Sequence, residues 1–161
     1  MMKMESNKAN LGLDKELHKD AKIAIICAKF NENIVDDLRV EAKKVLLQQG
    51  LKEDNIQIFF VPGAYEIPLM CKVIAEQGKY DGIIVLGCII KGETYHFTQV
   101  ADACSEGVLN VSVAHKLPIG YGVLAVDNIS QALSRSARNE DNKGRDAALA
   151  TLMMINNLKK F

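Results

Sequence analysis

Residues 85–97 of the chain read VLGCIIKGETYHF and contain an abrupt change of character. Residues 85–90 are apolar and rich in branched side chains, as is typical of a strand inside a sheet. A cation, an acid, a hydroxyl and an imidazole then follow within six positions. Because polar groups of four kinds gather directly behind a buried strand, this stretch indicates a ligand site at a strand end.

Three other apolar runs share the character of the strand that ends at residue 90. All four are continuous rather than alternating, which predicts strands buried on both faces of a parallel sheet. The four predicted strands occupy residues 22–28, 56–61, 82–90 and 119–126.

Amphipathic stretches of helical length separate and follow these strands. Gly50 and Gly78 stand at the ends of the first two stretches, where many helices end in a left-handed residue. The alternation predicts a three-layer α/β/α sandwich around a four-stranded parallel, flavodoxin-like sheet with right-handed crossovers. The predicted helices lie near residues 34–45, 67–75, 94–114 and 129–135, and from residue 144 onward.

The composition of the 161-residue chain is that of a globular protein, with 48% hydrophobic and 25% charged residues. Its twenty basic and twenty acidic residues cancel, which argues against a nucleic-acid or membrane-surface partner. The four cysteines form no CxxC pair, so we expect reduced thiols in a cytoplasmic protein rather than a zinc or redox motif. We expect a single domain at residues 22–161. Residues 1–21 are too polar for a signal peptide and are expected to form a flexible arm, able to add a strand to a neighbouring copy.

The loops that follow the four strands are the candidate site, because ligands of open parallel sheets gather beyond the carboxyl ends of the strands. In the first loop, Phe30 stands where a large apolar ring is normally inside the protein. It either lines a ligand pocket or caps the core, while Asn31 or Asn33 caps the next helix.

The second loop begins with Pro62-Gly63, which predicts a type II turn leading into a helix. The backbone amides of Ala64 and Tyr65 would then lie close to that helix N-terminus. Glu66 can accept hydrogen bonds from the hydroxyls of a ligand, or it can simply complement the helix dipole. The sequence leaves both interpretations of Glu66 open.

The third loop carries the largest number of reactive groups. Gly92 permits a tight turn, and Glu93 and Thr94 are predicted to open the next helix, where backbone amides and a hydroxyl can bind phosphate. Lys91 adds a positive charge, and the imidazole of His96 can exchange protons with a ligand. The glycine spacing is not that of a P-loop.

A basic cluster surrounds the last two predicted helices and comprises Arg135, Arg138, Lys143 and Arg145. Such a cluster is either a solvated surface or the second half of an anion site, in the same chain or in a neighbouring one. We recognise no Ser-His-Asp set, metal-ligand cluster or nucleic-acid-binding motif in the sequence.

Five segments together resemble lumazine synthase, and they keep the order and spacing of that family over residues 22–154. The resemblance implies a transferase of riboflavin biosynthesis that works without a cofactor or metal. Its substrates would be 5-amino-6-(D-ribitylamino)uracil and L-3,4-dihydroxy-2-butanone 4-phosphate, and its products 6,7-dimethyl-8-ribityllumazine, phosphate and water. The segments are FN (30–31), VPGAYEIP (61–68), LGCIIKGETYHF (86–97), YGVLAVDNISQAL (121–133) and NKGRDAA (142–148).

The resemblance also implies roles for individual residues. His96 corresponds to the proton-transfer histidine of the family. The phosphate would be held by Lys91, Gly92, Glu93 and Thr94, with Arg135 supplied by the adjacent subunit. The pyrimidine and ribityl groups would be held by Phe30, Asn31, Ala64, Tyr65, Glu66, Cys88, Ile89 and Ile90, and by Tyr121, Lys143 and Asp146 of the neighbour.

The same resemblance implies a homo-oligomer with active sites shared between chains. We expect a pentamer. A sixty-subunit icosahedral shell stays open, because the short link after Arg135 is compatible with one, and riboflavin synthase is a candidate partner. Three features depart from the family. Lys91 replaces an arginine, Thr98-Gln99 replaces an acidic-aromatic pair, and Asn139 replaces a lysine for which Arg138 is the candidate substitute.

Three other interpretations compete with the synthase. An archaeal-type riboflavin synthase shares the expected fold, but the intact phosphate loop argues against it. A non-catalytic flavin-binding or shell-forming relative would account for the departures at Lys91, Gln99 and Asn139. A flavodoxin-like electron carrier ranks last, because residues 29–33 offer no run of hydroxyls for a flavin phosphate.

Overall fold

The computed structural model describes residues 12–161 and is built around a parallel sheet with strand order β2-β1-β3-β4. The register aligns Ile23 of β1 with Ile56 of β2 and with Gly82 of β3, and β3 pairs with β4 as far as Ile90 and Val126. The prediction of a four-stranded parallel sheet is confirmed. Its strands are β1 (Ile23–Ala28), β2 (Ile56–Val61), β3 (Gly82–Ile90) and β4 (Ile119–Val126).

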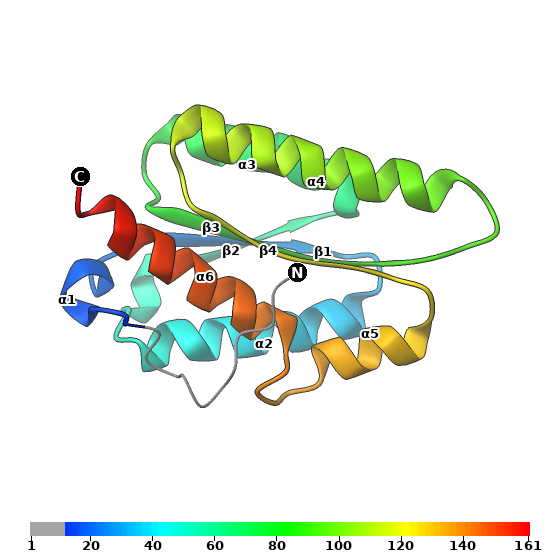
Figure 1. Ribbon diagram of the computed structural model, residues 1–161, viewed down its shortest axis with the longest axis horizontal. Helices are drawn as coiled ribbons and strands as arrows, with labels where there is room; N and C mark the ends of the chain where they lie inside the picture. The colour runs from blue at the N-terminus through cyan, green and yellow to red at the C-terminus, as the bar shows by residue number, and fades with distance from the viewer. Residues whose placement is uncertain (1–11) are drawn as a thin grey trace.

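Helices cover both faces of this sheet and make three layers (Figure 1). One face carries α3 (Ile67–Gln77) and α4 (His96–His115). Short 3-10 turns, η2 (Glu53–Asn55) and η3 (Ala64–Glu66), flank β2. The opposite face carries α1 (Lys15–His18), α2 (Glu32–Gln48), α5 (Ile129–Ser136) and α6 (Lys143–Leu158).

Burial on both faces explains the continuous apolar runs of the central strands. All six residues of β1 are buried, with Ile23 and Ile25 in the core under α2 and α6, and Ala24 and Ile26 in the core under α3. The prediction of two buried faces is wrong for β2, where Phe60 is 52% exposed. β2 lies at the edge of the sheet, where the helical layers no longer cover it fully.

The two predicted glycine stops are confirmed. Gly78 caps α3 in the left-handed conformation with φ +67°, and Gly50 follows the end of α2 with φ +94°. A side chain at either φ would be strained, so glycine ends these helices at low cost.

The expected N-terminal arm is shorter than residues 1–21, because residues 12–21 pack on the domain. His18 is buried between two partners: its Nε2 lies 3.0 Å from the carbonyl oxygen of Gln49, and its Nδ1 lies 2.8 Å from Asn156 Nδ2. Leu13 also joins the core. The sequence shows this segment only as polar residues around a few apolar ones, so its anchoring could not be seen there. Residues 1–11, and with them most of the segment expected to add a strand to a neighbour, lie outside the described residues.

The carboxyl ends of all four strands lie at one end of the sheet, to the right in Figure 1. The loops after β1, β2 and β3 therefore converge. Within residues 12–161, no helix is long and apolar enough to cross a membrane.

Candidate active site

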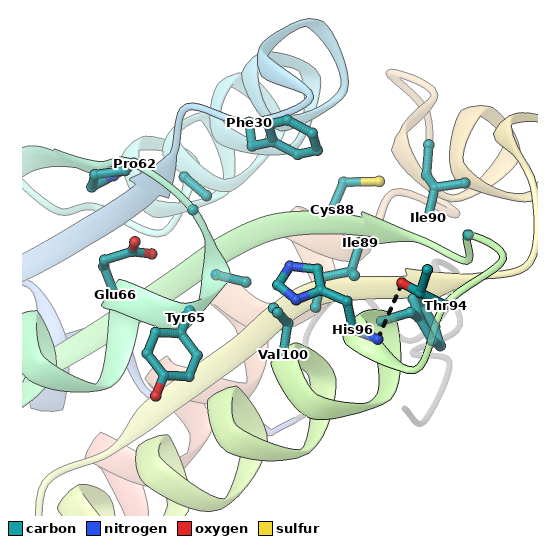
Figure 2. Close-up of a pocket in the computed structure, with 15 residues that line it drawn as sticks. Phe30, Pro62, Tyr65, Glu66, Cys88, Ile89, Ile90, Thr94, His96 and Val100 are labelled. Carbon is teal, nitrogen blue, oxygen red and sulfur yellow. Dashed lines mark hydrogen bonds between the residues drawn. The ribbon is translucent and has the colours of Figure 1, made fainter.

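A cavity at the carboxyl ends of β1, β2 and β3, here called the main cavity, has a volume of about 500 Å³. This is within the usual range for small-molecule sites. Most of its lining comes from the three predicted loops, with His96 projecting into the middle (Figure 2). The lining residues are Ala28, Phe30, Pro62, Gly63, Ala64, Tyr65, Glu66, Cys88, Ile89, Ile90, Gly92, Thr94, His96, Phe97 and Val100.

Backbone hydrogen bonds join the first loop to the second. The amides of Lys29 and Phe30 donate to the carbonyls of Val61 and Pro62, at 2.8 and 3.0 Å. Phe30 does not cap the core. Its ring is 72% exposed and stands at the mouth of the cavity, where a planar ligand can stack on it.

Asn31 lies beside the main cavity and bonds the backbone of β3. It adopts the left-handed conformation with φ 59°, and its Nδ2 donates to the carbonyl of Cys88 at 2.8 Å. It forms no side-chain cap on α2 and does not line the main cavity. Asn31 therefore ties the first loop to β3 directly behind Phe30.

The second loop does not form the predicted type II turn. Gly63 is extended, with φ −151°, whereas that turn needs a positive φ at this position. The chain instead enters η3, in which the amide of Glu66 donates to the Gly63 carbonyl at 3.2 Å. Glu66 stands at the N-cap of α3 but makes no side-chain cap bond. Its carboxylate lines the cavity, which favours the ligand-binding interpretation over the purely dipolar one.

The third loop is longer than predicted, because α4 begins at His96 and not at Thr94. The N-cap residue is Tyr95, and the Thr94 hydroxyl lies 3.4 Å from the His96 amide (Figure 2). Gly92 and Thr94 line the cavity immediately before the helix. The start of a 20-residue helix and the Thr94 hydroxyl thus lie at the same end of the cavity, and helix starts are suited to binding an anion.

The sulfur closest to the site is not a nucleophile at neutral pH. Cys88 is 3% exposed, and its burial raises the pKa of the thiol to about 11. Burial likewise raises the pKa of Cys27 and Cys71 to about 12. All four cysteines are free and buried, so their role here is packing.

A second cavity, of about 460 Å³, runs along β4 and brings together Tyr121, Arg135 and Lys143. β4 pairs with β3 alone among the described strands, so its other edge is open. Lys143 Nζ lies 3.2 Å from Asp146 Oδ2, and both side chains are largely buried. Burial, followed by the nearby Cys104 thiol, raises the pKa of the Tyr121 hydroxyl, which therefore stays protonated.

The predicted site residues thus fall into two sets. One set lies between Phe30 and His96 and lines the main cavity, except for Asn31, Lys91 and Glu93, which are not among its lining residues. The other set, Tyr121, Arg135 and Lys143 with Asp146 beside Lys143, lies at the β4 edge. In the described chain no residue lines both cavities. Arg138 lines neither cavity, and its Nε is 2.7 Å from Asp37 Oδ1 on α2.

The sequence interpretation missed some residues of the main cavity. Phe97 and Val100 lie one and four positions after His96, on the same side of α4, and the helical period could have placed them there. Ala28 and Pro62 line the cavity because their strands end there. Among the described residues, no group of three or more His, Cys, Asp or Glu side chains is arranged to hold a metal ion.

Comparison with known proteins agrees with this geometry. Residues 20–159 match the family model described as 6,7-dimethyl-8-ribityllumazine synthase. The chain belongs to the lumazine synthase family. A curated 6,7-dimethyl-8-ribityllumazine synthase from Blochmanniella pennsylvanica (strain BPEN) is 51% identical over 140 residues, which cover 86% of this chain and 89% of that protein. The resemblance inferred from the five segments is confirmed, and with it the assignment to a family of enzymes of riboflavin biosynthesis.

Proposed function

We propose that this protein is a 6,7-dimethyl-8-ribityllumazine synthase. It condenses 5-amino-6-(D-ribitylamino)uracil with L-3,4-dihydroxy-2-butanone 4-phosphate and releases phosphate and water. The observation that carries the proposal is the main cavity, in which an anion-binding helix start, an imidazole and a carboxylate share one hollow beside an exposed aromatic ring.

Each end of this cavity suits one substrate. Gly92, Glu93 and Thr94, with Lys91 alongside, receive the phosphate at the start of α4. The pyrimidine stacks on Phe30 and contacts the backbone of residues 88–90, and Glu66 accepts hydrogen bonds from the ribityl hydroxyls. Ala64 and Tyr65 support the ribityl chain through η3.

The chemistry needs few protein groups. The 5-amino nitrogen attacks the ketone, water leaves to give an imine, phosphate is eliminated, and ring closure with loss of a second water completes the lumazine. Holding two reactive molecules together supplies much of the acceleration. Fixed amide donors stabilise the departing phosphate. His96 moves the protons, since histidine is the side chain suited to proton exchange near neutral pH, and such catalysis contributes about 10²–10⁴-fold.

The position of the second cavity supports a shared site. Tyr121, Arg135, Lys143 and Asp146 lie at the open β4 edge, apart from His96 on the same chain. In a cyclic pentamer this edge closes over the main cavity of the adjacent subunit, and Arg135 reaches its phosphate. The protein is proposed to act in the cytoplasm, and riboflavin synthase, which consumes the lumazine, is a candidate partner.

The deciding experiment mixes the purified protein with both substrates and follows lumazine absorbance and phosphate release in parallel. We expect both products to appear together and faster than without enzyme. His96→Ala should lower kcat by about a hundredfold or more, while sedimentation shows unchanged assembly, because His96 is exposed and its side chain packs no core.

Two results would contradict the proposal. Riboflavin formed from lumazine alone would identify the archaeal-type riboflavin synthase reaction. Ligand binding by an assembled protein without any phosphate release would identify a non-catalytic relative.

A further inference from the structure

The first residue of the NKGRDAA segment, Asn142, is fully buried, although it lies between two strongly polar segments. Its side-chain oxygen accepts hydrogen bonds from the amides of Gly144 and Arg145, at 2.8 and 3.1 Å, and so caps α6. A cap needs only this oxygen and is usually at the surface. The burial of Asn142 therefore calls for a second role.

The amide nitrogen of Asn142 makes contacts that a cap does not require. It lies 2.9 Å from the carbonyl oxygen of Ser136, 3.1 Å from that of Ala137 and 3.3 Å from that of Asp37. Ser136 is the last residue of α5, and Asp37 lies in α2. One side chain thus joins the end of α5, the middle of α2 and the start of α6.

The residues next to these anchor points are the cations of the second cavity. Arg135 immediately precedes Ser136, and Lys143 lies between Asn142 and Gly144. Gly144 is packed so closely on Leu38 of α2 that a Cβ there would clash with the Leu38 carbonyl oxygen. The start of α6, and with it Lys143, is therefore held against α2.

The departure from the family pattern in residues 136–141 strengthens this bracing. Arg138 bonds the carboxylate of Asp37, while Asn142 contacts the carbonyl of the same residue. The segment between α5 and α6 therefore contacts Asp37 twice, at its carboxylate and at its backbone carbonyl. These contacts hold the link in place. The link also contains none of the glycines usual in the family.

We propose that Asn142 is a positioning residue that places Arg135 for the phosphate-bearing substrate, and Lys143 for the pyrimidine substrate, in the site of the adjacent subunit. This inference rests on the proposed function. Its physical basis is that the two N–H groups of a buried side-chain amide face three carbonyls while its oxygen accepts from two backbone amides, so no other arrangement has equal energy. The backbone that carries the two cations is then fixed before a ligand binds.

Asn142→Asp separates positioning from capping. Aspartate keeps the oxygen that caps α6 but replaces the donating nitrogen with an oxygen that faces three carbonyls. We expect the KM for the phosphate-bearing ketone to rise by about ten- to a hundredfold through Arg135, and the KM for the pyrimidine substrate to rise as well through Lys143. Inhibition by added inorganic phosphate should weaken in parallel. Asn142→Ser, which keeps a small donor and acceptor, should give an intermediate value and serves if the aspartate variant does not assemble.

Asn156→Ala is the matched control. Asn156 is also a buried asparagine of α6, but it lies near the other end of the helix, where it binds His18 and the amide of Asp14. This variant should lose stability and keep both KM values. An equal rise of the ketone KM in Asn156→Ala, or a wild-type ketone KM in Asn142→Asp, would overturn the proposal.

A direct binding measurement separates this inference from the proposed function. Calorimetry with inorganic phosphate does not depend on turnover. Weaker phosphate binding by Asn142→Asp than by wild type supports the positioning role even if the protein forms no lumazine, and equal binding refutes it.

Discussion

Asn31 shows how one residue can shape the site without lining it. A non-glycine residue in the left-handed region costs about 1–2 kcal/mol, and asparagine tolerates that region better than most residues. The hydrogen bond from Asn31 Nδ2 to the Cys88 carbonyl offsets part of this cost and holds the loop that carries Phe30. We therefore propose that Asn31 positions Phe30.

Substitutions at Asn31 should separate strain from hydrogen bonding. Asn31→Ala should lower the free energy of unfolding by about 2 kcal/mol, because it keeps the strained conformation and loses the bond. Asn31→Gly relieves the strain and should cost about 1 kcal/mol or less. Both variants should raise the KM for the pyrimidine substrate, because Phe30 loses its support. Urea denaturation and steady-state kinetics test this, and equal destabilisation by the two variants would contradict it.

At the scale of elements, α6 approaches the sheet through glycines of the strands it crosses. A Cβ at Gly120 of β4 would clash with the Ala147 carbonyl and the Thr151 hydroxyl, both on α6. The Thr151 hydroxyl also donates to the Ala147 carbonyl at 2.8 Å. This close approach brings Lys143 at the start of α6 next to β4, so the packing of one helix helps to form the second cavity.

Two strand glycines provide a matched test of that packing. Gly120→Ala should lower the free energy of unfolding by about 3 kcal/mol, since neither backbone nor buried hydroxyl can move away without loss. Gly87→Ala on the adjacent β3 adds a Cβ at ordinary distances of 3.5 Å from Ala28 and Val123, so its effect should stay within about 1 kcal/mol. Denaturant titrations decide the point, and similar midpoints for the two variants would show that α6 can shift.

At the scale of the whole molecule, the separation of the two cavities within one chain favours a site that is shared between chains. The main cavity contains the proposed acid-base group, and the β4 edge contains the proposed second phosphate cation, so one chain presents two unlike halves. If the β4 edge of each copy contacts the main cavity of the next copy, repetition of that contact closes the copies into a ring.

Mixing inactive variants tests this arrangement. His96→Ala and Arg135→Ala should each be inactive or nearly so, but after dissociation and joint reassembly about a quarter of the sites pair an intact His96 with an intact Arg135. Activity should recover to that extent. The control mixes wild type with the double variant His96→Ala/Arg135→Ala. If each site lay within one chain, this control mixture would give about half of full activity, and the mixture of the two single variants would give none. No recovery in an assembled mixture would refute the shared site.

The sequence alone determined the order of the four strands and the main helices along the chain, and the end of the sheet at which the main cavity lies. Continuous branched runs imply buried parallel strands, and parallel strands bring their following loops to one end, so Phe30, Glu66, Thr94 and His96 could be placed together. Only the tertiary structure decided which residues far apart in the sequence contact one another. Asn31 bonds Cys88 across 57 positions, and Asn142 contacts Asp37 across 105. Periodicity reports which side of an element is buried, whereas a hydrogen bond between distant segments depends on the packed arrangement of the whole chain.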